Sequence, residues 1–263
     1  MPIRSANINV MVQAAHKAAR HLVRDFGEVE NLQVSVKGPG DYVSAADHRA
    51  ERILHQELSR VRPSFGFLME EGGIVEGKDE QRWIVDPLDG TTNFLHGLPH
   101  FAISLALERQ GELVAGVVYD PIKDEMFCAE KGAGAYLNDR RLRVSRRSDL
   151  ANSLIGTGIP VLDWQGREQG FAQQLERVSA EVAGIRRLGT ASLDLAYIAA
   201  GRLDGFWEYG LKPWDMAAGI VLIQEAGGMV GRLEDGDLLS PGTLVAGNQG
   251  IYPQLALLLR AAP

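Results

Sequence analysis

Residues 83–94, W-I-V-D-P-L-D-G-T-T-N-F, constrain the fold more than any other stretch of the chain. The apolar residues 83–85 predict the end of a buried strand. Pro87 disfavours the α region for the residue before it, so we expect Asp86 and Asp89 to lie in an extended turn and not along a helix face. The stretch therefore predicts a buried strand that leads directly into an acidic turn.

The groups that follow this strand suit a phosphate ester held by hard divalent cations. Mg²⁺ binds carboxylate oxygens, here those of Asp86 and Asp89, together with substrate phosphate. Gly90 allows a tight turn and the close approach of a ligand, and Thr91 and Thr92 offer hydroxyl and N–H groups where a short helix could begin. The same residues also make a good turn that binds nothing, so this stretch alone leaves both interpretations open.

The totals place the chain among ordinary globular proteins. Its 263 residues suffice for one large domain or two smaller ones, and 45% are hydrophobic and 23% charged. The net charge of -7 gives no overall signal for nucleic acid or membrane binding. The sequence has no basic-then-apolar leader and no apolar run near about 18 residues. We therefore expect a cytoplasmic protein that does not bind membranes, with its one cysteine, Cys128, buried in a strand.

Apolar periodicity divides the chain into helices and strands. It predicts helices over residues 5–26, 45–62, 165–182, 191–200, 213–226 and 250–259. It predicts strands over residues 34–37, 65–69, 83–85, 101–108, 112–119, 125–129, 154–158, 204–209, 229–233 and 244–246, and residues 132–139 continue the antiparallel pattern with a turn. Hairpins give way to alternating strands and helices near residue 150, which predicts two sub-domains, about 1–148 and 149–263, packed as a single unit.

Several acids outside the first stretch have both a structural and a functional interpretation. Glu70 and Glu71 follow the strand at 65–69 and precede glycines, as a metal-binding edge or a plain polar loop would. Asp47 completes an S-x-x-D capping box, which explains it without any chemistry. Asp215 lies in the first turn of a predicted helix, where acids are ordinary. None of these residues decides the function alone.

Two longer motifs decide between these interpretations, because they resemble both signatures of the inositol monophosphatase family. They are D-P-L-D-G-T-T-N-F at 86–94 and W-D-M-A-A-G at 214–219, in the family's order and at a fitting separation. The resemblance covers at least residues 37–228. It extends to Asp47, Glu70, Glu71, Gly189, Thr190, Ala191 and Glu208. One departure is Met69-Glu70-Glu71-Gly72, where the family often has Gly-Glu-Glu-Ser; it keeps both carboxylates but leaves the local loop shape open.

The resemblance implies an α/β (α+β) fold, the layered α-β-α-β-α sandwich of the inositol monophosphatase and fructose-1,6-bisphosphatase type. It also implies a lithium-sensitive, Mg²⁺-dependent hydrolase of myo-inositol monophosphates, usually a homodimer. Relatives that act on 3′-phosphoadenosine 5′-phosphate or histidinol phosphate commonly carry a basic residue where this chain has Thr92, which favours the inositol phosphate branch. Fructose-1,6-bisphosphate, histidinol phosphate and 3′-phosphoadenosine 5′-phosphate remain the alternative substrates.

The resemblance also assigns roles to individual residues. It implies two or three Mg²⁺ ions, held by Glu70, Asp86, the Leu88 carbonyl, Asp89 and Asp215. Asp47, Glu70 and Thr91 would activate and orient the attacking water. The substrate would be bound by Gly90, Thr91, Gly189, Thr190, Ala191, Glu208 and Asp215. No nucleophilic Ser or Cys with a nearby base is evident in the sequence, so direct attack by water fits the residues better than a covalent intermediate.

A second class of function stays open because of a basic cluster. It comprises Arg140, Arg141, Arg143, Arg146 and Arg147. The cluster could contact RNA, although it lacks interleaved aromatic residues and a solvated or ion-paired edge explains it equally. Some bacterial relatives are regulatory proteins that bind the transcription machinery or ribosomal RNA complexes, so we expect such contact only as an additional role.

Overall fold

A computed structural model describes residues 5–28, 34–38, 41–160 and 167–260 of the chain. Its helices are α1 (Ala6–Phe26), α2 (Ala45–Val61), α3 (Thr91–Leu95), α4 (Arg167–Glu181), α5 (Ala191–Ala199), α6 (Pro213–Glu225) and α7 (Tyr252–Arg260), with a 3₁₀ turn at Leu150–Asn152. Its first strands are β1 (Val34–Gly38), β2 (Asp41–Ser44), β3 (Gly66–Met69), β4 (Gly73–Val75), β5 (Gln81–Asp89), β6 (Ala102–Arg109) and β7 (Glu112–Asp120). The remaining strands are β8 (Glu125–Glu130), β9 (Gly134–Leu137), β10 (Arg140–Arg141), β11 (Leu154–Thr157), β12 (Gly184–Arg186), β13 (Gly205–Tyr209), β14 (Met229–Arg232) and β15 (Thr243–Gly247).

The first two helices begin at the caps that the sequence predicts. The Ser5 side chain accepts the Ile8 N–H at the start of α1, and Gly27 ends that helix. Ser44 and Asp47 form the predicted capping box of α2. Both helices bury an apolar stripe against the inner residues of β5, β6, β7 and β8, which forms one core of the molecule.

Eight strands form the larger sheet, in the order β10-β9-β8-β7-β6-β5-β3-β4. Neighbouring strands of this sheet are antiparallel except β3 and β5, which are parallel. Five strands form the smaller sheet, in the order β12-β11-β13-β15-β14. In this sheet β11 is parallel to both of its neighbours, and the other pairs are antiparallel. β1 and β2 form a separate hairpin.

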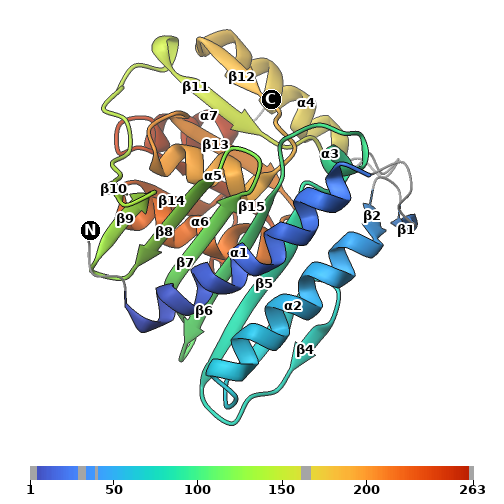
Figure 1. Ribbon diagram of the computed structural model, residues 1–263. Helices are drawn as coiled ribbons and strands as arrows, with labels where there is room; N and C mark the ends of the chain where they lie inside the picture. The colour runs from blue at the N-terminus through green and yellow to red at the C-terminus, as the bar shows by residue number, and fades with distance from the viewer. Residues whose placement is uncertain (1–4, 29–33, 39–40, 161–166, 261–263) are drawn as a thin grey trace.

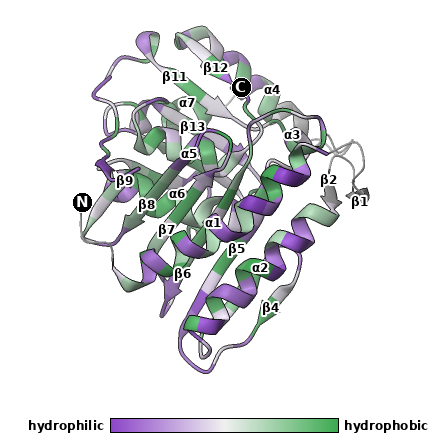
Figure 2. Cartoon of the chain, in the orientation of Figure 1, coloured by the Kyte–Doolittle hydropathy of each residue, from purple (hydrophilic) through white to green (hydrophobic). Residues whose placement is uncertain are grey.

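The sheets and helices alternate in five layers. α1 and α2 cover one face of the larger sheet (Figure 1), and Figure 2 shows hydrophilic residues on their outward faces. α5 and α6 lie between the two sheets and share a core with both of them. α4 and α7 cover the outer face of the smaller sheet. The predicted α-β-α-β-α sandwich is therefore confirmed, while the sub-domain boundary near residue 148 stays a prediction.

One local prediction is wrong, and several short strands were not predicted. The expected end of a strand at Val85 is wrong, because β5 continues to Asp89, where its pairing with β6 resumes after an irregularity between Asp86 and Asp89. The strands β2, β4, β10 and β12 were not predicted, since each has only two to four residues and shows little alternation of its own. The predicted helix start at residue 165 lies outside the described residues. Cys128 is buried in β8, as expected.

Candidate active site

The site begins where β3 ends beside its parallel neighbour β5, which continues. Met69 pairs with Val85, so the next residues, Glu70 and Asp86, follow at the same edge of the sheet. The Glu70 N–H donates to the Val85 carbonyl at 3.2 Å, which fixes the start of the acidic turn. Asp86 is 1% exposed, and one of its oxygens accepts the Leu88 N–H at 2.9 Å. The extended backbone that Pro87 favours is therefore kept within a strand.

Asp86 lies among three other carboxylates. Its burial, and then the charges of Glu70, Asp89 and Asp215, raise the pKa of Asp86 well above the usual range. Burial raises the pKa of Asp89 to about 6, although Asp89 accepts the Ser192 N–H at 2.7 Å. Burial and then the charge of Asp89 raise the pKa of Asp215 to about 8. The four acids come from β3, β5 and α6 and repel one another when ionised.

This repulsion is what a divalent cation would offset. Buried carboxylates are unfavourable unless they are paired, protonated or bound to a metal, and oxygen donors are the ligands that Mg²⁺ prefers. Within the described ranges, no three His, Cys, Asp or Glu side chains already form a metal-ligand cluster. The fit to Mg²⁺ thus rests on the chemistry of the four acids and not on a preformed coordination sphere.

Asp47 both caps α2 and contacts Thr91, so the structural explanation of this residue does not exclude the contact that the functional one requires. One of its oxygens accepts the Ser44 N–H at 2.9 Å and caps α2. The other accepts a hydrogen bond from the Thr91 hydroxyl at 3.1 Å, and that hydroxyl also lies 3.0 Å from the Leu88 carbonyl. Asp47 is fully buried, and this burial raises its pKa more than the bonds from Ser44 lower it. The cap and the contact with Thr91 therefore coexist.

Gly90 is required by both conformation and space. Its φ of 92° lies in the left-handed region, which favours glycine. A Cβ atom there would lie 2.5 Å from the Thr190 hydroxyl oxygen and 3.1 Å from the His100 carbonyl. α3 begins directly after Gly90, as the two threonines suggested. The structure thus brings the segment that contains Gly90 and Thr91 against the loop that contains Thr190.

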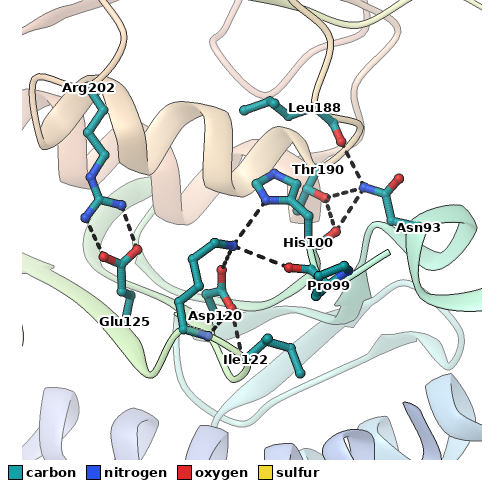
Figure 3. Close-up of polar contacts among 10 residues, drawn as sticks. Asn93, Pro99, His100, Asp120, Ile122, Glu125, Leu188, Thr190 and Arg202 are labelled. Atoms are coloured by element: carbon teal, nitrogen blue, oxygen red, sulfur yellow. Dashed lines mark hydrogen bonds and ion pairs between the residues drawn. The ribbon is translucent and has the colours of Figure 1, made fainter. Parts of the chain in front are cut away.

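One side chain that the sequence analysis did not single out joins these two segments. The Asn93 amide donates to the His100 and Leu188 carbonyls, both at 2.9 Å, and the Thr190 hydroxyl donates to the His100 carbonyl at 3.0 Å (Figure 3). The loop before α5 is thereby attached to α3. The position of Asn93 inside the motif was a usable signal, although its partners are distant in the sequence.

A second group of acids lies on what we call the polyol side of the site, where Glu208 is predicted to bind the alcohol part of the substrate. Glu208 lies on β13, where burial and then the charge of Asp89 raise its pKa to about 8. A Cβ at Gly158 would lie 1.9 Å from the Glu208 carboxyl carbon, so glycine leaves the room that this carboxyl occupies. Asp194 on α5 is 1% exposed, and burial and then Glu208 raise its pKa well above the usual range. Sequence reasoning missed Asp194, whose signal is one acid within an apolar helix.

The basic cluster is not part of this site. Arg140 and Arg141 form β10 at one edge of the larger sheet, whereas β3 and β5 lie toward its other edge. Arg147 pairs with the fully buried Asp204 at 2.8 Å, as the ion-paired alternative predicted for one member of the cluster. Arg140, Arg141, Arg143 and Arg146 are exposed.

A model of the inositol monophosphatase family matches residues 4–262. The chain belongs to this family. It is 63% identical over 254 residues to the inositol-1-monophosphatase of Mesorhizobium japonicum, covering 96% of this chain and 95% of that protein. It is 44% identical over 253 residues to the Nus factor SuhB of Pseudomonas aeruginosa, covering 94% and 93%. The crystal structure of extragenic suppressor protein SuhB from Bartonella henselae matches with a TM-score of 0.95 at 57% identity, covering 98% of this chain and 100% of that chain.

These findings confirm the predicted resemblance, the fold class and membership of a phosphatase family. No helix in the described ranges is long and apolar enough to cross a membrane. The cytoplasmic location, the metal ions and the roles of the individual site residues stay predictions. The relatives have two kinds of name, phosphatase and Nus factor, so family membership alone does not choose between the two kinds of role.

Proposed function

We propose that the chain is a Mg²⁺-dependent phosphatase that hydrolyses myo-inositol monophosphates to the free alcohol and phosphate. The observation that carries the proposal is the burial of Asp86 among Glu70, Asp89 and Asp215. A buried cluster of acids beside a glycine turn has the charge that divalent cations and a phosphate ester would together balance. The inositol-1-monophosphatase of Mesorhizobium japonicum supports the same substrate class through its name and its 63% identity.

Water activation would depend on Thr91. Two or three Mg²⁺ ions, held by Glu70, Asp86, the Leu88 carbonyl, Asp89 and Asp215, would supply a Lewis acid that neutralises phosphate charge and lowers the pKa of water. The Thr91 hydroxyl has one proton and two acceptors, Asp47 and the Leu88 carbonyl. When it donates to either, its oxygen is free to accept a hydrogen bond from the attacking water and so to orient it. Glu70 would orient the same water, and the Gly90 and Thr91 amides would bind phosphate.

The polyol side favours a substrate with a single phosphate. Glu208 and Asp194 place two buried carboxyl groups near the loop that contains Gly189, Thr190 and Ala191. Such groups exchange hydrogen bonds with sugar-like hydroxyls, and they would repel a second phosphate whenever they are ionised. We therefore favour inositol monophosphates over fructose-1,6-bisphosphate, with Asp215 shared between metal and substrate.

A substrate panel with and without metal tests the proposal. We expect inositol monophosphates to be hydrolysed with Mg²⁺, the rate to vanish in EDTA, and activity to return when Mg²⁺ is restored. Fructose-1,6-bisphosphate, histidinol phosphate and 3′-phosphoadenosine 5′-phosphate should be slower. Full activity after exhaustive dialysis against EDTA would refute the metal dependence, and a preference for one of the other three esters would correct the substrate class.

Lithium sensitivity and a homodimeric state are two further parts of the proposal. Li⁺ should inhibit the Mg²⁺-supported rate more than an equal concentration of Na⁺, which controls for ionic strength. Sedimentation of the purified protein should give the mass of two chains of 28.6 kDa each. A rate that Li⁺ and Na⁺ affect equally, or a single-chain mass at micromolar concentration, would remove the corresponding part.

An additional regulatory role has one structural observation in its favour. The exposed arginines of the basic cluster lie away from the carboxylates, so they could bind RNA while the site remains open. Phosphate contacts weaken steeply with salt, so we expect RNA to be retained at low salt and released at moderate salt. Replacement of Arg140, Arg141 and Arg143 by alanine should abolish retention and leave phosphatase activity unchanged. If these substitutions leave RNA binding unchanged, the basic cluster does not have this role.

A further inference from the structure

A buried acid outside the predicted site lies one helical turn from Asp47. Glu51 on α2 is 7% exposed, and its spacing of four residues places it on the same face of the helix as Asp47. One Glu51 oxygen accepts the Glu71 backbone N–H at 2.9 Å, and the other oxygen lies against the backbone of Gly72. Its partner is therefore the backbone of the turn that carries Glu70.

That turn is short, and hydrogen bonds hold its backbone. Only residues 70–72 separate β3 from β4, and Met69 pairs with Gly73 across the turn. The Glu70 N–H donates to the Val85 carbonyl of β5, while the Glu71 N–H donates to Glu51. A Cβ at Gly72 would lie 3.0 Å from a Glu51 oxygen and 2.8 Å from the Met69 methyl. Glycine thus allows the turn to approach the carboxylate closely.

α2 consequently contacts both halves of the predicted water-activating group. Asp47 accepts a hydrogen bond from the Thr91 hydroxyl, and Glu51 accepts one from the Glu71 N–H, directly after Glu70. Both carboxylates are attached to one helix whose inner face, including Leu54 and Leu58, is fully buried. The separation between Thr91 and Glu70 is therefore set through a rigid element and not through a flexible loop.

We propose that Glu51 is a positioning residue, which sets the Glu70 carboxylate against Asp86 by holding the backbone at Glu71 and Gly72. The inference deepens the proposed function and rests on it for the role of Glu70. An ionised acceptor forms stronger hydrogen bonds to N–H groups than a neutral one. Burial, and then the charge of Glu71, disfavour an ionised Glu51, so a carboxylate at this position is unfavourable unless the turn needs a strong acceptor.

Amide hydrogen exchange of the metal-free protein tests the contact itself. In Glu51→Ala, we expect the Glu71 and Gly72 amides to exchange at least about 10-fold faster, while amides of the sheet core do not change. Leu58→Ala is the matched control, because it removes a fully buried side chain from the same helix, about two turns beyond Glu51. Unchanged exchange at Glu71 and Gly72 in Glu51→Ala would overturn the proposal.

Calorimetric titration with Mg²⁺ tests the consequence, well below the melting temperature of every variant. Substitutions behind a metal ligand typically cost 10–100-fold in affinity or activity, so Glu51→Ala should bind Mg²⁺ at least about 10-fold more weakly. Leu58→Ala should bind it as the wild type does, although it melts lower. Glu51→Gln keeps one acceptor oxygen and should recover part of the loss, and it provides the test if Glu51→Ala does not fold.

The two levels of the proposal fail in different ways. If the wild-type protein neither binds Mg²⁺ nor hydrolyses an inositol phosphate, the proposed function is wrong, and the exchange experiment still reports whether Glu51 holds the turn. If the wild type is active with Mg²⁺ but both Glu51 variants bind the metal and turn over normally, the proposed function stands and Glu51 is not a positioning residue.

Discussion

Asp47 makes two contacts, one that caps a helix and one with Thr91, the residue proposed to activate water. The two oxygens of Asp47 have different partners, since one accepts the Ser44 N–H and caps α2, and the other accepts a hydrogen bond from the Thr91 hydroxyl. A capping role alone would tolerate asparagine, which caps about as well as aspartate. Substitution can therefore separate the two contributions.

We expect Asp47→Asn to lower kcat by about 100-fold, the scale of a lost catalytic electrostatic contact, while the melting temperature barely moves. Thr91→Ala should lower kcat similarly, and the double mutant should cost far less than the product of the two losses, because the residues act as a unit. Thr91→Ser keeps the hydroxyl and should retain much of the rate. Independent, multiplicative losses, or an active Asp47→Asn enzyme, would leave Asp47 as a cap only.

Asp215→Asn separates metal binding from folding. The change keeps the shape and removes a charge that faces Asp89 and Asp86. We expect kcat to fall at least about 100-fold, and the metal-free protein at pH 8.5 to melt no lower than the wild type, because a repulsion is lost. Asp235→Asn, at an exposed acid, is the control and should change neither quantity. A near-wild-type rate in Asp215→Asn would remove Asp215 from the metal site.

At the scale of elements, the sequence predicted what local periodicity and caps determine. Ser5 and the Ser44–Asp47 box marked the starts of α1 and α2, and the apolar runs marked both arms of the β6–β7 hairpin. Periodicity could not show that β5 resumes its pairing at Asp89, because that pairing depends on β6. For the site, the motifs brought out the acids and Thr91. Asn93 and Glu51 were missed, since their partners are backbone groups of segments distant in the sequence.

The contact of α6 with β7 gives a prediction about packing. A Cβ at Gly116 would lie 2.6 Å from the Ala218 carbonyl oxygen and 2.9 Å from its Cα, and backbone atoms cannot move aside as a side chain can. Gly116→Ala should therefore lower the free energy of unfolding by about 1–3 kcal/mol, the usual cost of overpacking. Gly170→Ala, in α4 with open space around it, should instead raise it by about 0.5–1 kcal/mol. Urea unfolding measures both, and an unchanged midpoint for Gly116→Ala would show that the layers can separate.

At the scale of the whole molecule, the site gathers acids from three of the five layers. Asp86 and Asp89 come from the larger sheet, Asp215 and Asp194 from the central helices, and Glu208 from the smaller sheet. Folding therefore brings together charges that the unfolded chain keeps apart. Because the pKa values of Asp215 and Glu208 are about 8, both carboxyl groups keep their protons at pH 7 in the metal-free fold.

The stability of the metal-free protein should fall as the pH rises from 7 to 9. An unfolded chain releases its carboxyl protons near pH 4, whereas the folded state releases those of Asp215 and Glu208 near pH 8, so the free energy of unfolding decreases across this interval. The pKa of His100, lowered to about 4 mainly by burial, has the opposite effect, but only below about pH 6.5, where an unfolded histidine titrates.

Thermal melts at pH 7 and pH 9 check this expectation. Mg²⁺ should raise the melting temperature more at pH 9 than at pH 7, because it binds the ionised acids. The Asp215→Asn and Glu208→Gln double variant should show a smaller drop with pH in the absence of metal. A metal-free melting temperature that is the same at both values would contradict the raised pKa values.

The Asn93 amide also limits how the substrate preference of such a protein could change. Because that amide holds both the His100 and the Leu188 carbonyls, the loop before α5 cannot be lengthened or shortened without releasing α3 (Figure 3). Surface loops usually diversify by insertions, and an insertion here would therefore lower the turnover of every substrate. New specificities would have to arise from side-chain replacement around a loop of constant length, and a library that varies residues at fixed length should yield more active variants than one that varies the length.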